Sequence, residues 1–175
     1  FPPSKPTPKE TAMSRIDIPA TIDAAPEASR PLLEQVGKQL GAVPNLFRLA
    51  AQSPAALEGY LGLFGALGKG RLPAATRERI ALAIAAFNGC GYCLSAHTYL
   101  AANLAKLSPE EITANRLGRS TDTEADAAVV FAVRVAERRG HITDADLADV
   151  RAAGYDDAQI VEIKIDAAIL SRVMR

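Results

Sequence analysis

The chain has 175 residues, 49% of them hydrophobic, and its 20 basic and 20 acidic residues give a formal net charge of zero. This length suffices for one domain with a proper core, and because no block of like charge stands out, neither nucleic acid nor a membrane is expected as a partner. Two cysteines are too few for a disulfide scaffold, so their close spacing points to chemistry or metal binding, in a reducing and therefore cytoplasmic compartment.

The first twelve residues differ in composition from the rest. Residues 1–12 carry four prolines and no apolar period, which indicates a flexible arm, a leader or a cloning remnant. Met13 is interpreted as the natural start. We therefore expect a single helical domain over residues 13–175. The longest apolar run near the cysteines, residues 80–87, is far shorter than the roughly 20 residues that a bilayer span requires.

Helix signals follow one another along this domain. Ser29 is expected to cap the first helix, and Ser108-Pro109-Glu110-Glu111 has the pattern of a capping box. The Ala-rich and Leu-rich composition favours helices, and no alternating strand pattern is longer than a few residues. The fold class is therefore all-α, a compact orthogonal bundle of about eight helices. Helices are expected over residues 29–40, 44–49, 53–67 and 73–87, from 90, from 108, and over 121–139, 143–153 and 157–174.

The two cysteines lie just after a helix-ending signal. Asn88-Gly89 ends one helix, so that Cys90 begins the next. At 100° per residue, Cys90, Cys93 and His97 then share one helix face within roughly 60° of arc. The positive end of a helix favours thiolates, and His97, one turn beyond Cys93, can exchange a proton with it. This pattern is typical of thiol redox chemistry.

Glu78 is the fourth candidate. In one unbroken helix it would lie about 18 Å from Cys90, at 1.5 Å per residue. The break at Asn88-Gly89 lets the two helices fold against each other, and a carboxylate that reached His97 would orient the imidazole. The sequence leaves this geometry open. A glutamate on its own would more often be a solvated surface charge.

Other interpretations of these residues remain. The cysteines could be small core residues, or Cys90, Cys93, His97 and a carboxylate could hold zinc, although three ligands would then crowd one helix. A thioredoxin-like protein would need strands alternating with helices, and these are missing. Tyr92 could line the pocket, shield it or merely pack. His141 is expected to be an ordinary exposed residue.

The spacing of Glu78, Cys90, Cys93 and His97 resembles the active site of the alkylhydroperoxidase D family, within the carboxymuconolactone decarboxylase-like superfamily. Further segments are similar to its peroxidase-related branch, and the likeness runs from about residue 16 to residue 163. These segments are Pro44-Asn45-Leu46-Phe47, residues 72–79, Gly154-Tyr155-Asp156-Asp157 and Ile160-Val161-Glu162-Ile163.

The resemblance implies a thiol-dependent peroxidase of alkylhydroperoxidase D-like fold. Cys93 would attack a hydroperoxide and become a sulfenic acid, Cys90 would resolve it to a disulfide, and His97 and Glu78 would form a proton relay. It implies no cofactor and no metal. The reductant would be an unknown thiol protein or a lipoyl-bearing protein, and the assembly a homo-oligomer, either a trimer or a hexamer.

This sequence departs from the family pattern in two places. Tyr92 stands between the cysteines where well-studied members have a histidine, and residues 164–172 do not resemble the usual C-terminal ending. True decarboxylases of the superfamily lack the cysteine pair, which argues against lactone decarboxylation. A general thiol-disulfide oxidoreductase and a non-catalytic helical oligomer or ligand-binding protein remain as alternatives.

Overall fold

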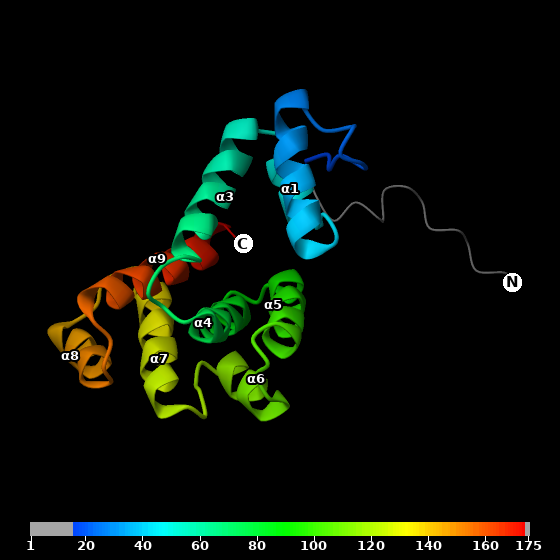
Figure 1. Ribbon diagram of the computed structural model, residues 1–175. Coiled ribbons are helices and arrows are strands. Elements are labelled where there is room, and N and C mark those ends of the chain that lie inside the picture. Colours follow the sequence, from blue (N-terminus) through cyan, green and yellow to red (C-terminus); the bar gives the residue numbers. More distant parts are fainter. Residues whose placement is uncertain (1–15, 174–175) are drawn as a thin grey trace, which may run out of the picture. The chain divides into compact units, whose positions relative to one another are not determined.

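The structure, a computed structural model, describes residues 16–173, and every regular element within them is helical (Figure 1). The expected all-α fold is confirmed, with nine α-helices in this part of the chain. The chain divides between Ala66 and Leu67 into two compact units, which are described separately. The single domain expected over residues 13–175 stays a prediction, and the arm at residues 1–12 lies outside the described residues.

The first unit contains short helices around a small apolar core. Its elements are the 3-10 helix η1 (Glu27–Ser29), α1 (Arg30–Leu40), α2 (Asn45–Ala50) and all but the last residue of α3 (Pro54–Leu67). The rings of Phe47, Tyr60 and Phe64 pack in sequence, with centroid distances of 5.9 and 4.5 Å. Fully buried in this core are Ala25, Leu33, Ala51 and Leu57.

Ser29 precedes α1 as expected, but its side chain does not cap the helix. The hydroxyl donates instead to the carbonyl oxygen of Ala51, at 2.7 Å. Pro31, near the start of α1, has no N–H for a cap to satisfy. The buried hydroxyl therefore bonds to a distant carbonyl and ties the start of α1 to the end of α2.

The second unit is built around α4, which packs against α5, α6, α7 and α9 (Figure 1). Six consecutive residues of α4, residues 80–85, are at most 4% exposed. Burying each of its larger side chains, such as Ile80 and Leu82, stabilises the unit by about 2 kcal/mol. The helices of this unit are α4 (Ala74–Phe87), α5 (Gly91–Asn103), α6 (Pro109–Arg116), α7 (Thr123–Glu137), α8 (Asp144–Ala152) and α9 (Asp157–Val173).

The C-terminal helix α9 is tied to both ends of α4. The Glu162 carboxylate accepts the backbone N–H groups of Arg71 and Leu72, at 2.9 and 2.7 Å, just before α4 begins. At the other end, the Asn88 side-chain amide donates to the carbonyl oxygen of Leu170, at 3.0 Å. The divergent segment 164–172 therefore lies within a helix that holds the central helix in place.

Of the two hydrogen bonds in the capping box predicted at the start of α6, one is present. The Ser108 hydroxyl accepts the Glu111 N–H at 3.2 Å, but the Glu111 carboxylate is bound elsewhere. Burial raises the pKa of Glu111, and hydrogen bonds from neighbouring hydroxyl, amide and backbone donors outweigh this and lower it to about 2. Those donors and a guanidinium converge from α4, α6 and the loop before α7, and they are Arg79, Asn115, Ser120 and Thr121.

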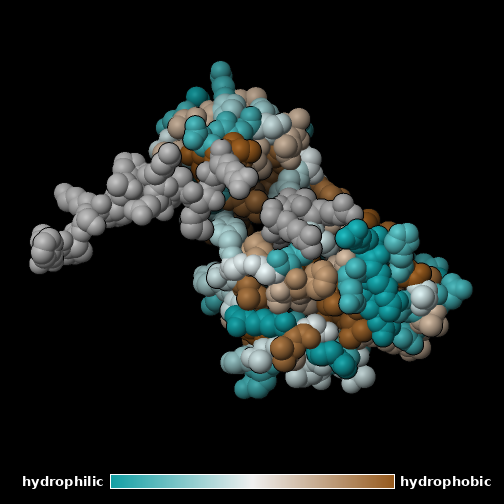
Figure 2. All heavy atoms as spheres, turned by 180° about the vertical axis from the view of Figure 1, so that it is seen from behind, coloured by the Kyte–Doolittle hydropathy of each residue, from teal (hydrophilic) through white to brown (hydrophobic). Residues whose placement is uncertain are grey.

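The surface of the second unit mixes apolar and polar residues. On the face that Figure 2 shows, hydrophobic patches lie between hydrophilic ones. The large exposed hydrophobic side chains of α5 include Tyr92 and Tyr99, which are 49% and 66% exposed. None of the helices in the described part of the chain is both long enough and apolar enough to cross a membrane.

Candidate active site

The helix break predicted at Asn88-Gly89 is present. Asn88 caps the C-terminus of α4, and Gly89 has a φ of +65°, a conformation that glycine adopts without strain. Cys90 is the N-cap of α5, and its sulfur accepts the N–H of Cys93 at 3.3 Å. The local sequence therefore ends one helix and starts the next within three residues, with a cysteine sulfur at the positive end of α5.

The two cysteines are joined in a disulfide, with their Cα atoms 5.4 Å apart. Cys93 is only 4% exposed, whereas Cys90 is partly exposed. The structure thus shows the oxidised form of the pair. A spacing of three residues at the start of a helix brings the two sulfurs within bonding distance, as predicted from the sequence.

Glu78 and His97 are brought together, which the sequence left open. The Oε2 atom of Glu78, on α4, lies 2.9 Å from Nδ1 of His97, on α5. Their side chains are 23% and 16% exposed, so the contact is largely shielded from solvent. Because an ionised carboxylate can only accept a hydrogen bond, Nδ1 of His97 is the donor in this contact. The hydrogen bond forms because α5 folds back against α4 after the turn.

The remaining sequence candidates lie apart from this contact or are open to solvent. Tyr92, in the first turn of α5, is 49% exposed, so about half of its surface faces solvent. His141 is exposed in the loop between α7 and α8, as expected. Within residues 16–173, no cluster of three or more His, Cys, Asp or Glu side chains is arranged to hold a metal ion.

Sequence reasoning did not single out Asp166, a buried acid on α9. It is 3% exposed, and its Oδ1 atom lies 3.2 Å from Nη2 of Arg77, the residue before Glu78. Burial raises the pKa of Asp166 to about 6, Arg77 opposes this, and the charges of Glu162 and Glu78 add to it. The only sequence signal for its burial is its place in an apolar stretch, between Ile165 and Ala167.

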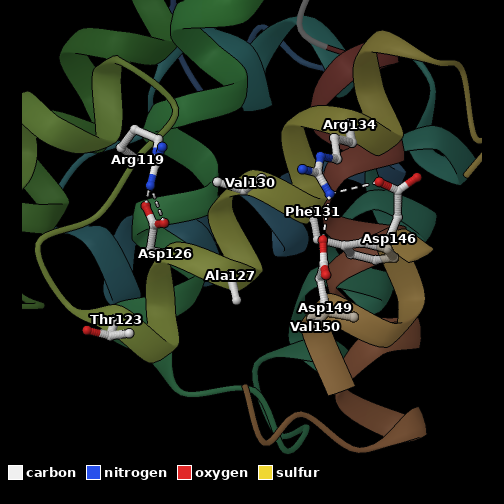
Figure 3. Close-up of a pocket in the computed structure, with 10 residues that line it drawn as sticks. All are labelled: Arg119, Thr123, Asp126, Ala127, Val130, Phe131, Arg134, Asp146, Asp149 and Val150. Atoms are coloured by element: carbon white, nitrogen blue, oxygen red, sulfur yellow. Dashed lines mark hydrogen bonds and ion pairs between the residues drawn. The ribbon is translucent and has the colours of Figure 1, made fainter. Parts of the chain in front are cut away.

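A pocket between α7 and α8 does not include the cysteines and is lined by basic and acidic side chains that form ion pairs (Figure 3). Arg119 pairs with Asp126 at 2.7 Å, and Arg134 pairs with Asp146 and Asp149 at 2.8 and 3.2 Å. None of the residues predicted to form the site lines this pocket. These ion pairs join α7 to α8 and to the loop before α7.

The sequence matches one known family over about half of its length. Residues 54–138 match the profile of the carboxymuconolactone decarboxylase family. This range includes Glu78, Cys90, Cys93 and His97. No curated protein sequence matches the chain.

Several solved structures share the fold. A peroxidase-related protein from Silicibacter sp. TM1040 superposes with a TM-score of 0.79 at 23% identity, over 93% of this chain and 90% of that one. An alkylhydroperoxidase AhpD core protein from Ralstonia eutropha JMP134, also peroxidase-related, has a TM-score of 0.79 at 26% identity, over 90% and 84%. The debrominase Bmp8 has a TM-score of 0.71 at 20% identity, over 93% and 89%. The profile match over residues 54–138 and the fold shared with these structures support the resemblance of the chain to the carboxymuconolactone decarboxylase-like superfamily.

Proposed function

We propose that this protein is a thiol-dependent peroxidase that reduces hydroperoxides through Cys93 and a Cys90–Cys93 disulfide. The observation that carries the proposal is the Glu78–His97 hydrogen bond, at 2.9 Å, which joins α4 to α5, the helix that begins at the bonded cysteine pair. A proton relay next to two thiols is what such a reaction needs. The peroxidase-related names of two proteins with this fold are consistent with it.

The first step is formation of the Cys93 thiolate. Glu78 accepts the Nδ1–H of His97 and holds the ring so that Nε2 is the basic nitrogen. His97 lies four residues after Cys93 on α5, the spacing that puts two side chains on one helix face. The Cys93 proton passes to Nε2, and the Glu78 carboxylate stabilises the imidazolium that forms.

The next two steps consume the peroxide. The Cys93 thiolate attacks one oxygen of the hydroperoxide, the O–O bond breaks, and the alcohol leaves with the proton that His97 holds. Cys93 becomes a sulfenic acid. The Cys90 thiolate then attacks the Cys93 sulfur, the S–O bond breaks, and hydroxide leaves as water after taking up a proton. The product is the disulfide seen in the structure, and a dithiol must reduce it for another turnover.

A second candidate, a general thiol-disulfide oxidoreductase, uses the same residues. It is favoured by the position of Cys90, which is partly exposed and caps α5. Turnover with hydrogen peroxide and with a model disulfide such as oxidised glutathione separates the two functions. A non-catalytic role would leave both substrates untouched.

The peroxidase proposal is tested by mass spectrometry of the reduced protein after one equivalent of hydrogen peroxide. The wild type should form the Cys90–Cys93 disulfide. Cys90→Ser should stop at a sulfenic acid on Cys93, which dimedone traps, and Cys93→Ser should consume no peroxide. Retention of peroxidase activity in Cys93→Ser, or a wild type that forms no disulfide, would rule the proposal out.

The partners and assembly follow from the resemblance rather than from the contacts above. We propose a thiol protein or a lipoyl-bearing protein as the reductant, and a trimer or hexamer as the assembly. Light scattering measures the assembly directly, and a coupled assay with either reductant identifies the electron donor.

A further inference from the structure

The two sulfurs of the disulfide differ in how a second molecule can reach them. Cys93 is 4% exposed, while Cys90 is partly exposed and stands at the very start of α5. The residues on either side of Cys90 are the exposed glycines Gly89 and Gly91, and a Cβ atom built on either would meet no atom within 4 Å outside the adjoining backbone and chain neighbours. The backbone on both sides of Cys90 is therefore open to an incoming group.

Reduction of a disulfide requires a thiolate to attack one sulfur while the other leaves. The attacking sulfur approaches along the extension of the S–S bond, on the side away from the leaving sulfur. For Cys93 that side is enclosed by protein, since the residue is 4% exposed. Cys90 is less enclosed, because it is partly exposed and both of its chain neighbours, Gly89 and Gly91, are exposed.

We propose that the reducing dithiol enters at Cys90, so that the two halves of the cycle use different sulfurs. This inference rests on the proposed peroxidase function, and it assigns the reductive half-reaction of the same site. A small hydroperoxide reacts at the enclosed Cys93, and a larger thiol reacts at the accessible Cys90. Access to the two sulfurs then separates the oxidant from the reductant by size.

The chemistry balances without a further reagent. One thiolate of the dithiol forms a bond to the Cys90 sulfur, the Cys90–Cys93 bond breaks, and its electron pair goes to Cys93. Cys93 leaves as a thiolate, the form in which it attacks the next hydroperoxide. The second thiolate of the dithiol then attacks the first, the mixed disulfide breaks, and Cys90 leaves as a thiolate. The dithiol ends as a disulfide, and both cysteines are reduced.

The test maps the mixed disulfide that a monothiol probe, glutathione, forms with the full chain. The protein is oxidised with diamide, mixed with excess glutathione, quenched in acid after milliseconds to seconds, and digested with pepsin at low pH. Fragment masses show which cysteine carries glutathione. We expect Cys90 to carry at least about ten times more than Cys93, because access limits exchange. Equal labelling, or a preference for Cys93, overturns the inference.

This result is independent of whether peroxide is the substrate, because diamide prepares the disulfide. Peroxide consumption by the reduced protein is measured in parallel. Failure of the proposed function would show as no reaction with peroxide while glutathione still marks Cys90. Failure of the inference would show as normal peroxide consumption with glutathione on Cys93.

A variant that narrows the approach gives a second measurement. Gly91→Val adds a branched side chain beside Cys90 at a position where a Cβ meets open space, so the fold should tolerate it. It should slow reduction by glutathione about fivefold to tenfold and change oxidation by peroxide less than about twofold, since thiol access alone is obstructed. The matched control is Ala102→Val, an exposed position near the other end of α5, which should change neither rate. Equal slowing of both reactions in Gly91→Val contradicts the assignment.

Discussion

Two glutamates of the second unit, Glu78 on α4 and Glu111 on α6, differ in the number of hydrogen bonds that their carboxylates accept. The Glu111 carboxylate accepts hydrogen bonds from side chains and backbone of α4, α6 and the loop before α7, and the residue is 4% exposed. Among the described residues, the one hydrogen bond of the Glu78 carboxylate goes to His97, and its side chain is 23% exposed.

The difference separates a structural carboxylate from one that can take part in proton transfer. Burial raises the pKa of Glu111, and its many hydrogen bonds more than reverse this, to about 2, so it stays ionised at neutral pH and holds three segments together. Glu78 has lone pairs to spare, and its hydrogen-bond partner is a histidine. A carboxylate saturated by fixed donors gives rigidity, and one bound to a histidine can respond when that histidine changes charge.

The largest expected effect is on stability. Glu111→Ala leaves the Arg79 guanidinium and several buried donors without their acceptor, and should lower the free energy of unfolding by about 3 kcal/mol or more. Urea denaturation measures it. The matched control is Glu110→Ala, the exposed neighbour on α6, which should lower the free energy of unfolding far less. If Glu111→Ala and Glu110→Ala lost similar free energies of unfolding, the hydrogen bonds of the Glu111 carboxylate would not hold the unit together, and its contrast with Glu78 would fail.

The second prediction concerns Glu78 and the rate of reaction. Glu78→Gln should slow oxidation of Cys93 by hydrogen peroxide about 100-fold, the usual range for loss of acid–base assistance, which corresponds to about 2.7 kcal/mol. The free energy of unfolding should change by less than about 1 kcal/mol. Stopped-flow oxidation of the reduced protein by hydrogen peroxide is the readout, with urea denaturation of the same variant as the measure of stability. A variant that is destabilised but reacts at the wild-type rate would assign Glu78 a structural role.

The third prediction uses pH to isolate Glu111. Its pKa is lower in the folded state, about 2, than in the unfolded chain, so its contribution is complete above the unfolded value and is lost as the pH falls toward the folded one. Between pH 5 and pH 3 the wild type should lose about 2 kcal/mol more than Glu111→Gln, which cannot titrate there. Urea unfolding at each pH gives this difference. Parallel acid profiles for the two proteins would contradict the hydrogen-bonded state of Glu111.

The smallest expected effect removes a single donor from the Glu111 carboxylate. The Ser120 hydroxyl donates to Glu111 at 2.5 Å, and Ser120→Ala should lower the free energy of unfolding by about 1 kcal/mol. Ser95→Ala is the control, because the exposed Ser95 hydroxyl donates only to the Gly91 carbonyl oxygen of its own helix. A thermal melt of both variants suffices, and a larger loss in Ser95→Ala would be the contrary result.

The ends of most helices follow from signals that lie within a few residues of each end, so they could be predicted from the sequence alone. Proline, serine and glycine mark helix ends through the hydrogen bonds of a single turn, and the α4–α5 break at Asn88-Gly89 lies where it was expected. The shared face of Cys90, Cys93 and His97 needs only the period of one helix. The proximity of the two cysteines is therefore a property of the sequence.

The tertiary structure decided which distant groups meet. Glu78 and His97 are 19 residues apart on two helices, and the local signals at their ends do not determine how α5 packs against the buried face of α4. The capping box at Glu111 was only half right for the same reason, because donors from α4 and the loop before α7 converge on its carboxylate. The burial of Asp166 against Arg77 is likewise visible only once α9 is in place. Helix ends depend on neighbours in sequence, whereas the Glu78–His97 contact depends on packing, which the whole core of the unit determines.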